Sequence, residues 1–211
     1  MSEKKKLTFM QLFWGNEKDI PVTAASLIKE ADRLENFGYK VQLIFTDNGS
    51  EDYSRKLLIK LVKNRKNVVL IFNDENLGNC VARNQAIGAA TGEYLLMVDG
   101  DIAIHTGMDW LVRYLEGCPE CYCMGFNSYE CKNDIKLANK PMPADPIVVT
   151  VNYKLKTIQH VALTQYGMFP AWLFKEAGLK FDEQAPYREP GWGWEDNDLF
   201  WGMDKLGHGE V

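Results

Sequence analysis

Short apolar runs alternate with longer amphipathic stretches through the first half of the chain. In those stretches apolar residues recur every three or four positions, which is the spacing of a helix with one buried face. We expect strands at residues 7–14, 41–45, 67–72 and 93–98, and helices at 22–37, 53–64 and 79–90. Each strand–helix–strand step is long enough for a parallel crossover, so the pattern predicts a Rossmann-like parallel sheet.

The pattern is less regular after residue 101. Helices are expected at 109–116, 170–177 and 195–206, a strand at 121–126, a hairpin from 147–153 and 157–164, and a loop at 130–146. We therefore predict one α/β domain over residues 1–211, with a central, mainly parallel sheet flanked by helices and a smaller β region in its second half.

The composition is that of a globular protein, with 46% hydrophobic and 25% charged residues. The 24 basic and 29 acidic residues give a net charge of −5, which argues against a general nucleic-acid surface. No apolar run approaches the roughly 18 residues of a transmembrane segment. Residues 7–14 are too short and too interrupted by polar residues for a signal peptide, so we expect a cytoplasmic protein.

Four of the five cysteines lie close together, at Cys118, Cys121, Cys123 and Cys131. This cluster could hold zinc, but structural zinc sites more often show two separated Cys-x2-Cys pairs. The alternative is a strand at 121–126 whose thiols are small buried apolar groups, and this is the interpretation we favour. The sequence leaves zinc binding by the Cys118–Cys131 cluster open.

Polar residues follow each of the four predicted parallel strands, and two carboxylates follow the last one. Asp99 and Asp101 flank Gly100 directly after the apolar run at 93–98. Ligands of open parallel sheets bind at the carboxyl ends of the strands, and carboxylate oxygens suit Mg²⁺ or Mn²⁺ together with phosphate. A plain turn is the alternative for this triplet. Because Asp47 and Asn48 reach the same edge of the sheet, we favour a divalent-metal and diphosphate site.

Five segments, in order, resemble motifs of the family-2 glycosyltransferases of the GT-A fold. They are Asp47-Asn48-Gly49-Ser50, Asn76-Leu77-Gly78-Asn79-Cys80-Val81-Ala82-Arg83-Asn84, Asp99-Gly100-Asp101, Phe181-Asp182-Glu183, and Gly191-Trp192-Gly193-Trp194-Glu195-Asp196-Asn197-Asp198-Leu199. The third is similar to the family's metal-binding DxD motif. The last is similar to the Gly-Trp-Gly-x-Glu-Asp motif of galactosyl- and N-acetylgalactosaminyltransferases. The resemblance extends from about residue 7 to the C-terminus, and it implies a nucleotide-sugar-binding half at 1–101 and an acceptor-binding half at 102–211.

The resemblance implies a set of donor-binding residues: Asp47, Asn48, Arg83, Asp99 and Gly100. Asp47 would accept hydrogen bonds from the base or ribose, with a local turn of its own backbone as the alternative. Arg83 would contact the nucleotide or its diphosphate, with a structural ion pair as the alternative. Asp99 would reach the ribose or a metal-bound water, and Asp101 would ligate Mn²⁺ or Mg²⁺ directly.

The C-terminal motif supplies the catalytic residues that the resemblance implies. Asp196 would act as general base on the acceptor hydroxyl, and Glu195 would orient acceptor or donor hydroxyls, although these roles are exchangeable. Acidic residues also favour the start of a helix through its dipole, which is the competing interpretation. Trp192, Gly193 and Trp194 would form an acceptor-binding platform for a sugar ring. A base opposite the leaving group gives single displacement with inversion.

Two departures from the family pattern limit the resemblance. A histidine near the C-terminus commonly completes the metal site in the family, and here His208 is followed by only three residues. Either His208 is that ligand, or the ligand is absent, or the chain is truncated. The first strand ends in Phe13-Trp14-Gly15-Asn16 rather than a Pro-Thr-x-Asn turn, so UDP as the nucleotide is an expectation from the family alone.

The sequence therefore predicts a metal-dependent, inverting glycosyltransferase that moves a sugar from a nucleotide-sugar, expected to be a UDP-sugar, to a hydroxyl acceptor. A sugar-phosphate nucleotidyltransferase is one alternative, but it would need a glycine-rich basic loop that residues 14–21 do not supply. A non-catalytic nucleotide- or sugar-binding module is the other. The sequence leaves open the sugar, the oligomeric state and the acceptor, whether glycan, lipid, protein or modified base.

Overall fold

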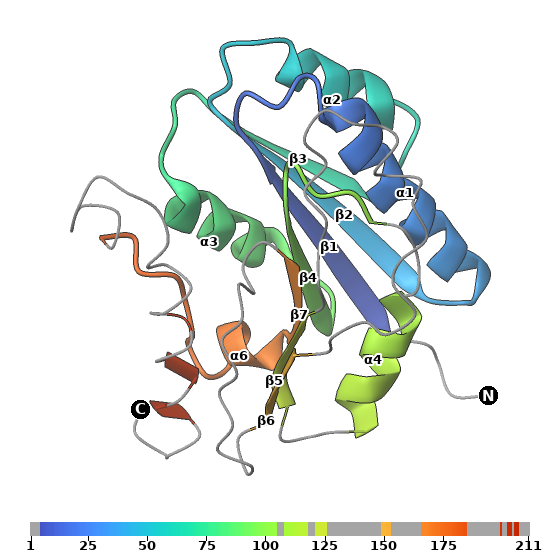
Figure 1. The fold of residues 1–211 in the computed structure, drawn as a ribbon, viewed down its shortest axis with the longest axis vertical. Coiled ribbons are helices and arrows are strands. Elements are labelled where there is room, and N and C mark those ends of the chain that lie inside the picture. The colour runs from blue at the N-terminus through green and yellow to red at the C-terminus, as the bar shows by residue number, and fades with distance from the viewer. Residues whose placement is uncertain are drawn as a thin grey trace.

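The computed structural model describes residues 5–104, 108–117, 121–125, 149–152 and 166–184, and residues 199, 202, 203, 205 and 206. Its centre is a seven-stranded sheet with helices on both faces (Figure 1). Across the sheet the strands are β3 (Val68–Asn73), β2 (Lys40–Asn48), β1 (Lys6–Phe13), β4 (Tyr94–Asp99), β7 (Tyr166–Pro170), β5 (Cys121–Gly125) and β6 (Val149–Asn152). The helices are α1 (Ile20–Asn36), α2 (Ser54–Val62), α3 (Asn79–Ala89), α4 (Met108–Gly117) and α6 (Trp172–Lys175).

The order of the parallel strands creates a switch point between β1 and β4. β3, β2, β1 and β4 are parallel, and the chain passes from β1 outward to β3 before it crosses back to β4 on the other side of β1. Such a crossover leaves room above the carboxyl ends of the two strands, where open α/β sheets bind ligands. The register sets Leu12 of β1 beside Asp99 of β4, and Phe13 beside Asp47 of β2.

The central strands β2, β1 and β4 are buried on both faces, which explains why they are almost continuously apolar. Side chains alternate between the faces. Leu7, Phe9 and Phe13 point to the cluster that packs under α1, α2 and α4. Met10 and Met97 point to the opposite cluster, under α3 and α6 (Figure 1).

The predicted first half is confirmed, and β2 continues further than expected, so that Asp47 and Asn48 are its last residues. Asp52 is not the cap of α2 that we expected, because Tyr53 holds that position; Asp52 lies one residue earlier, where its Oδ1 accepts the N–H of Ser54 at 2.9 Å in a local turn. The strand β7 was not predicted, and the helix expected at 170–177 is shortened to α6 because Pro170 ends β7. β6 pairs with β5, and the second hairpin strand (157–164) and the loop at 130–146 lie outside the described residues.

Within the described ranges, no helix is long and apolar enough to cross a membrane.

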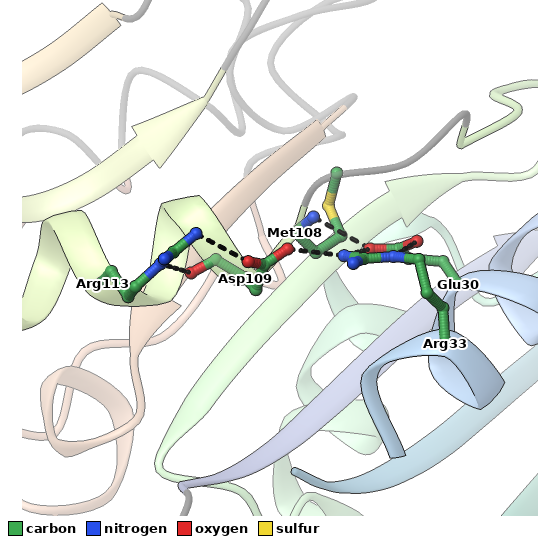
Figure 2. Close-up of polar contacts among 5 residues, drawn as sticks. All are labelled: Glu30, Arg33, Met108, Asp109 and Arg113. Carbon is green, nitrogen blue, oxygen red and sulfur yellow. Dashed lines mark hydrogen bonds and ion pairs between the residues drawn. The ribbon is translucent and has the colours of Figure 1, made fainter. Parts of the chain in front are cut away.

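A charged network joins α4 to α1 (Figure 2). The buried Glu30 accepts two hydrogen bonds from Arg33, each of 2.8 Å, and also the N–H of Met108 at 2.9 Å. Arg33 reaches on to Asp109 at 2.6 Å, and Asp109 also binds Arg113 at 2.7 Å. The hydrogen bond that Arg33 donates to Glu30 is the largest influence on the guanidinium and outweighs its desolvation, so that the pKa of Arg33 is raised. The network fixes the start of α4 against α1.

Candidate donor and metal site at the switch point

Asp99, Gly100, Asp101 and Ile102 form a tight turn at the end of β4. The N–H of Ile102 donates to the carbonyl of Asp99 at 3.2 Å, which closes the turn and makes Gly100 and Asp101 its two central residues. Asp101 is exposed, and Asp99 is partly buried. The turn therefore presents two carboxylates next to the switch point, as the metal-site interpretation requires.

Glycine is required at the centre of this turn. A Cβ atom on Gly100 would lie 2.6 Å from the carbonyl oxygen of Leu12 and 2.8 Å from both Asn16 Oδ1 and a ring carbon of Phe13. The turn therefore rests directly on the end of β1, and a side chain at this position would push the two carboxylates away from it.

Arg83 reaches across from α3 to the same turn. Its Nη2 donates to Asp99 Oδ1 at 2.8 Å, and its guanidinium lies 5.3 Å from the centroid of the Phe181 ring. The side chain of Arg83 is 7% exposed and that of Asp99 is 29% exposed. The structure thus forms the ion pair considered as the alternative for Arg83, and it also holds a guanidinium directly beside one of the two carboxylates.

Asn84, the next residue of α3, binds the backbone of Phe181 at two points. Its Nδ2 donates to the Phe181 carbonyl at 2.9 Å, and its Oδ1 accepts the Phe181 N–H at 3.1 Å. Nδ2 also donates to Glu183 at 3.0 Å. This pairing of Asn84 with Phe181 fixes the fully buried aromatic ring on which the guanidinium of Arg83 lies, so two of the predicted motifs form one structural unit.

Asp47 is completely buried at the end of β2, in contact with an arginine that the sequence interpretation missed. Arg55 Nε donates to Asp47 Oδ2 at 3.1 Å, and Arg55 Nη2 donates to the carbonyl of Asn73 at 2.5 Å. The guanidinium also lies 4.9 Å from the Phe72 ring centroid. Among the described residues, Asp47 Oδ1 has no hydrogen-bond partner. Because the side chain of Arg55 is 35% exposed, it is the member of this pair that faces solvent.

A signal for Arg55 was present in the sequence. It is the second residue of α2, where the helix dipole disfavours a cation, so a nearby carboxylate was to be expected. Its specific partner depends on how β2 and α2 lie together, which the pattern of residues alone does not give.

Asn48 organises the loop that precedes α3. Its Nδ2 donates to Asn76 at 2.8 Å and to the carbonyl of Gly78 at 3.3 Å, while its Oδ1 accepts from Asn73 at 2.9 Å and from the N–H of Leu77 at 3.2 Å. Both the amide nitrogen and the amide oxygen of Asn48 are therefore occupied by hydrogen bonds within the protein. In this structure Asn48 shapes the loop at 73–78 and the start of α3.

The predicted acceptor-side residues lie outside the described ranges; these are Trp192, Gly193, Trp194, Glu195, Asp196 and His208. The same holds for Cys118 and Cys131 and for the side chains of Cys121 and Cys123, so the zinc question is not tested. Among the described residues, no group of three or more His, Cys, Asp or Glu side chains is arranged to hold a metal ion.

Curated relatives match part of the chain. The glycosyltransferase AglE of Haloferax volcanii is 31% identical over 74 residues, which is 35% of this chain and 24% of that protein. The teichoic acid poly(glycerol phosphate) polymerase of Staphylococcus epidermidis is 32% identical over 97 residues, which is 46% of this chain and 13% of that protein. The matches therefore span about a quarter or less of the relatives' own length.

Solved structures share the fold over most of the chain. TarS 1-349 of S. aureus aligns with a TM-score of 0.60 and 17% identity, covering 94% of this chain and 54% of that one. The mannosyltransferase PcManGT of Pyrobaculum calidifontis, in complex with GDP-Man and Mn²⁺, aligns with a TM-score of 0.56 and 17% identity, covering 86% and 49%. At these identities the likeness establishes the fold, and the predicted GT-A architecture is confirmed.

Family membership follows from a match that covers most of the chain. Residues 13–174 fit the model of glycosyl transferase family 2, a range that includes the turn at Asp99, Gly100 and Asp101 as well as Arg83 and Asp47. The chain belongs to glycosyl transferase family 2.

Proposed function

We propose that this protein transfers a sugar from a nucleotide-sugar to a hydroxyl acceptor, with inversion and with the help of a divalent metal. One observation carries the proposal: Asp99 and the exposed Asp101 lie on one tight turn next to the switch point between β1 and β4, and Arg83 of α3 forms an ion pair with Asp99. A cation beside a pair of carboxylates is an arrangement that suits a metal-bound diphosphate. Residues 1–101 form the donor-binding half, and residues 102–211 form the acceptor-binding half.

The chemistry of the two carboxylates fits Mn²⁺ or Mg²⁺. These ions are commonly held by one or two protein carboxylates, with substrate phosphates and waters in the other positions. Asp101 would ligate the metal directly, Asp99 directly or through water, and His208 is a further candidate ligand. When bound, the metal neutralises negative charge on the leaving nucleoside diphosphate.

Two arginines at the edge of the sheet would receive the rest of the donor. Arg83 lies beside Asp99, and a planar guanidinium suits phosphate oxygens. Arg55 covers Asp47, so a base or ribose that approaches the end of β2 meets Arg55 before it reaches the carboxylate. A uracil is the expected base, and TarS has been solved in complex with UDP and with UDP-GlcNAc. A guanine is the alternative, since PcManGT has been solved with GDP-Man.

The acceptor side of the proposal rests on the C-terminal motif. Asp196 would remove the proton from the acceptor hydroxyl as its oxygen attacks the anomeric carbon, while Glu195 would orient the sugar hydroxyls. Trp192 and Trp194, with Gly193 between them, would present flat surfaces to a sugar ring. Attack from the face opposite the nucleotide inverts the configuration at the anomeric carbon.

Binding calorimetry tests the donor half of the proposal. UDP and GDP are each titrated with and without Mn²⁺ into the unsubstituted protein and into Asp101→Ala. We expect one nucleotide to bind with clear dependence on Mn²⁺ and to lose that dependence in Asp101→Ala. Binding that is indifferent to both the metal and the substitution would contradict the proposed metal site.

Hydrolysis of nucleotide-sugars identifies the donor without knowledge of the acceptor. A set of UDP- and GDP-sugars is incubated with the protein and Mn²⁺, and release of the nucleoside diphosphate is measured. With the donor known, Asp196→Asn should bind it as tightly as the unsubstituted protein but transfer no sugar. Turnover that survives in Asp196→Asn would exclude Asp196 as the general base.

A further inference from the structure

A glutamine lies in the middle of β1, in a stretch that is otherwise apolar and aromatic. Gln11 is 1% exposed. By strand alternation it shares the face of Leu7, Phe9 and Phe13, which pack in the core under α1. An amide in such a position is unfavourable unless its polar atoms find partners. The partners of Gln11 therefore indicate what it does.

Both partners of the Gln11 amide nitrogen belong to the turn that carries the two carboxylates. Nε2 donates to the carbonyl of Asp99 at 3.0 Å and to the carbonyl of Ile102 at 3.1 Å. These two carbonyls are the first and last of the turn, so one NH₂ group joins its ends. Ile102 N–H closes the same turn on the Asp99 carbonyl. These hydrogen bonds from β1 therefore fix the position of Gly100 and Asp101, which lie between the two ends of the turn.

The oxygen of the same amide indicates that Gln11 is present for its donor group. Among the described residues, Gln11 Oε1 has no hydrogen-bond partner although it is buried. An apolar side chain of similar shape would avoid that penalty and fill the same space. The two donated hydrogen bonds are the contribution that such a side chain could not make.

We propose that Gln11 is a positioning residue that sets the spacing of the Asp99 and Asp101 carboxylates for a metal-bound nucleoside diphosphate. This inference rests on the proposed function of the site. Metal ligands must be held within narrow limits, and groups that orient them from behind are typically worth about 10- to 100-fold in metal affinity. Gln11 joins the ends of the turn, and the end of β1 supports its centre through the close approach of Gly100 to Leu12.

A second strand glutamine offers a matched control. Gln42 of β2 also donates from Nε2 to a backbone carbonyl, that of Ala89, at 3.1 Å, and its Oε1 accepts from Thr8 and Thr91 at 2.8 Å. It lies near the amino end of the strands, paired in register with Thr8. Its replacement removes hydrogen bonds of a partly buried strand amide at the end of the sheet opposite to the turn, including one that Nε2 donates to a backbone carbonyl.

The experiment compares Gln11→Met with Gln42→Met. Mn²⁺-dependent binding of UDP and of GDP is measured by calorimetry, and hydrogen exchange is followed in the peptide that contains residues 99–104. In Gln11→Met we expect Mn²⁺-dependent nucleotide affinity to fall by roughly tenfold or more, and exchange in that peptide to accelerate. In Gln42→Met the melting temperature falls, while Mn²⁺ dependence and exchange at 99–104 stay as in the unsubstituted protein. Gln11→Leu takes the place of Gln11→Met if that variant does not fold.

The outcomes separate this inference from the proposed function. If the unsubstituted protein binds a nucleotide with Mn²⁺ and Gln11→Met binds it equally well with unchanged exchange, only the role of Gln11 is overturned. If the unsubstituted protein binds neither UDP nor GDP in a Mn²⁺-dependent manner, the proposed function fails, and the metal-positioning role of Gln11 fails with it. Equal losses of Mn²⁺ affinity in Gln11→Met and Gln42→Met would overturn the inference in favour of general destabilisation.

Discussion

Arg83 Nη2 and Asp99 Oδ1 are 2.8 Å apart, which joins α3 to the end of β4 across the switch point of the sheet. The two residues are 16 positions apart in the chain, and the crossover that carries α3 brings them together. The pair places a fixed positive charge beside the turn that carries Asp99 and Asp101. It is the contact on which the electrostatics of the proposed donor site depend.

Replacing Arg83 by lysine should weaken nucleoside diphosphate binding while the fold is kept. An ammonium lacks the planar fork that contacts Asp99 and the flat face that lies on Phe181, so we expect roughly tenfold weaker Mn²⁺-dependent binding. Calorimetry with UDP and GDP measures this change. Arg65→Lys is the control, because Arg65, in the turn after α2, pairs with Asp32 of α1 and is not part of the site. An equal effect in both variants would contradict the role given to Arg83.

Replacing Gly100 by alanine should displace the turn. The new methyl group would meet the Leu12 carbonyl, Asn16 and Phe13 at 2.6–2.8 Å, and we expect a loss of about 1–3 kcal/mol in the free energy of unfolding. Mn²⁺-dependent nucleotide binding should fall as well, because the carboxylates move with the turn. Denaturant titration and calorimetry measure the two effects.

Gly88→Ala is the matched control for Gly100→Ala. Gly88 lies near the end of α3, and a Cβ there would meet nothing within 4 Å. Alanine is the better helix former, so this variant should gain about 0.5–1 kcal/mol in stability and bind nucleotide normally. If Gly100→Ala behaved like Gly88→Ala, the close approach of the turn to β1 would be irrelevant to the site.

The sequence allowed the carboxylates of the site to be found but not the residues that hold them. Asp99 and Asp101 stand out because they end a strand that is buried on both faces, and the order of helices and strands predicted the parallel half of the sheet. Arg55 can be recognised in the sequence as a cation at the start of a helix, and Gln11 as an amide within an apolar run. Their partners depend on the direction of each side chain in the folded sheet, which local pattern does not give.

The strand β7 shows the limit of local pattern more directly. Its five residues include Gly167 and Pro170, which favour turns and are rare in strands. The strand exists because it pairs antiparallel with β4, from Tyr94 opposite Pro170 to Val98 opposite Tyr166. That partner is about 70 residues earlier in the chain, and no short-range signal carries such a contact.

Replacing Asn84 by aspartate should loosen the contact that fixes Phe181. The variant keeps the oxygen that accepts the Phe181 N–H. It replaces the NH₂ group, which donates to the Phe181 carbonyl and to Glu183, by a negatively charged oxygen. We expect a loss of about 1–3 kcal/mol in the free energy of unfolding, and weaker nucleotide binding because the guanidinium of Arg83 loses its support. Thermal melts and calorimetry measure these changes.

Asn67→Asp separates the two effects of the Asn84 substitution. Asn67 likewise donates from Nδ2 to a backbone carbonyl, that of Val41, and to a glutamate, Glu35, at 3.0 and 2.8 Å. It lies before β3 and away from the turn, so its substitution should lower stability and leave nucleotide binding intact. Normal binding by Asn84→Asp would show that Arg83 does not depend on the contact between Asn84 and Phe181.

The network between α1 and α4 should make stability depend on pH through Asp109 (Figure 2). Burial alone would raise the pKa of Asp109, but the hydrogen bond and charge of Arg33, together with the charge of Arg113, outweigh burial and lower it. A carboxylate with a lowered pKa in the folded state stabilises the protein above its unfolded pKa of about 3.9, and this contribution is lost as the pH falls through the folded value. Asp109→Asn should therefore be less stable at pH 7 by about 2 kcal/mol, with the difference shrinking as the pH falls below about 4.

The effect of salt distinguishes this network from a surface ion pair, Lys5–Glu93, whose carboxyl pKa is also lowered. The hydrogen bond of Lys5 is the main cause of the lowered pKa of Glu93, so Glu93 also stabilises above its unfolded pKa. The side chain of Glu93 is 50% exposed, however, whereas that of Asp109 is 23% exposed. Exposed pairs are screened more strongly, so about 0.5 M NaCl should remove most of the stability difference caused by Glu93→Gln and retain much of that caused by Asp109→Asn. Urea titrations of both variants over the range from pH 7 to pH 3, with and without salt, measure this contrast. Equal screening of the two would show that the Arg33–Asp109 contact behaves as an ordinary surface pair and does not anchor α4.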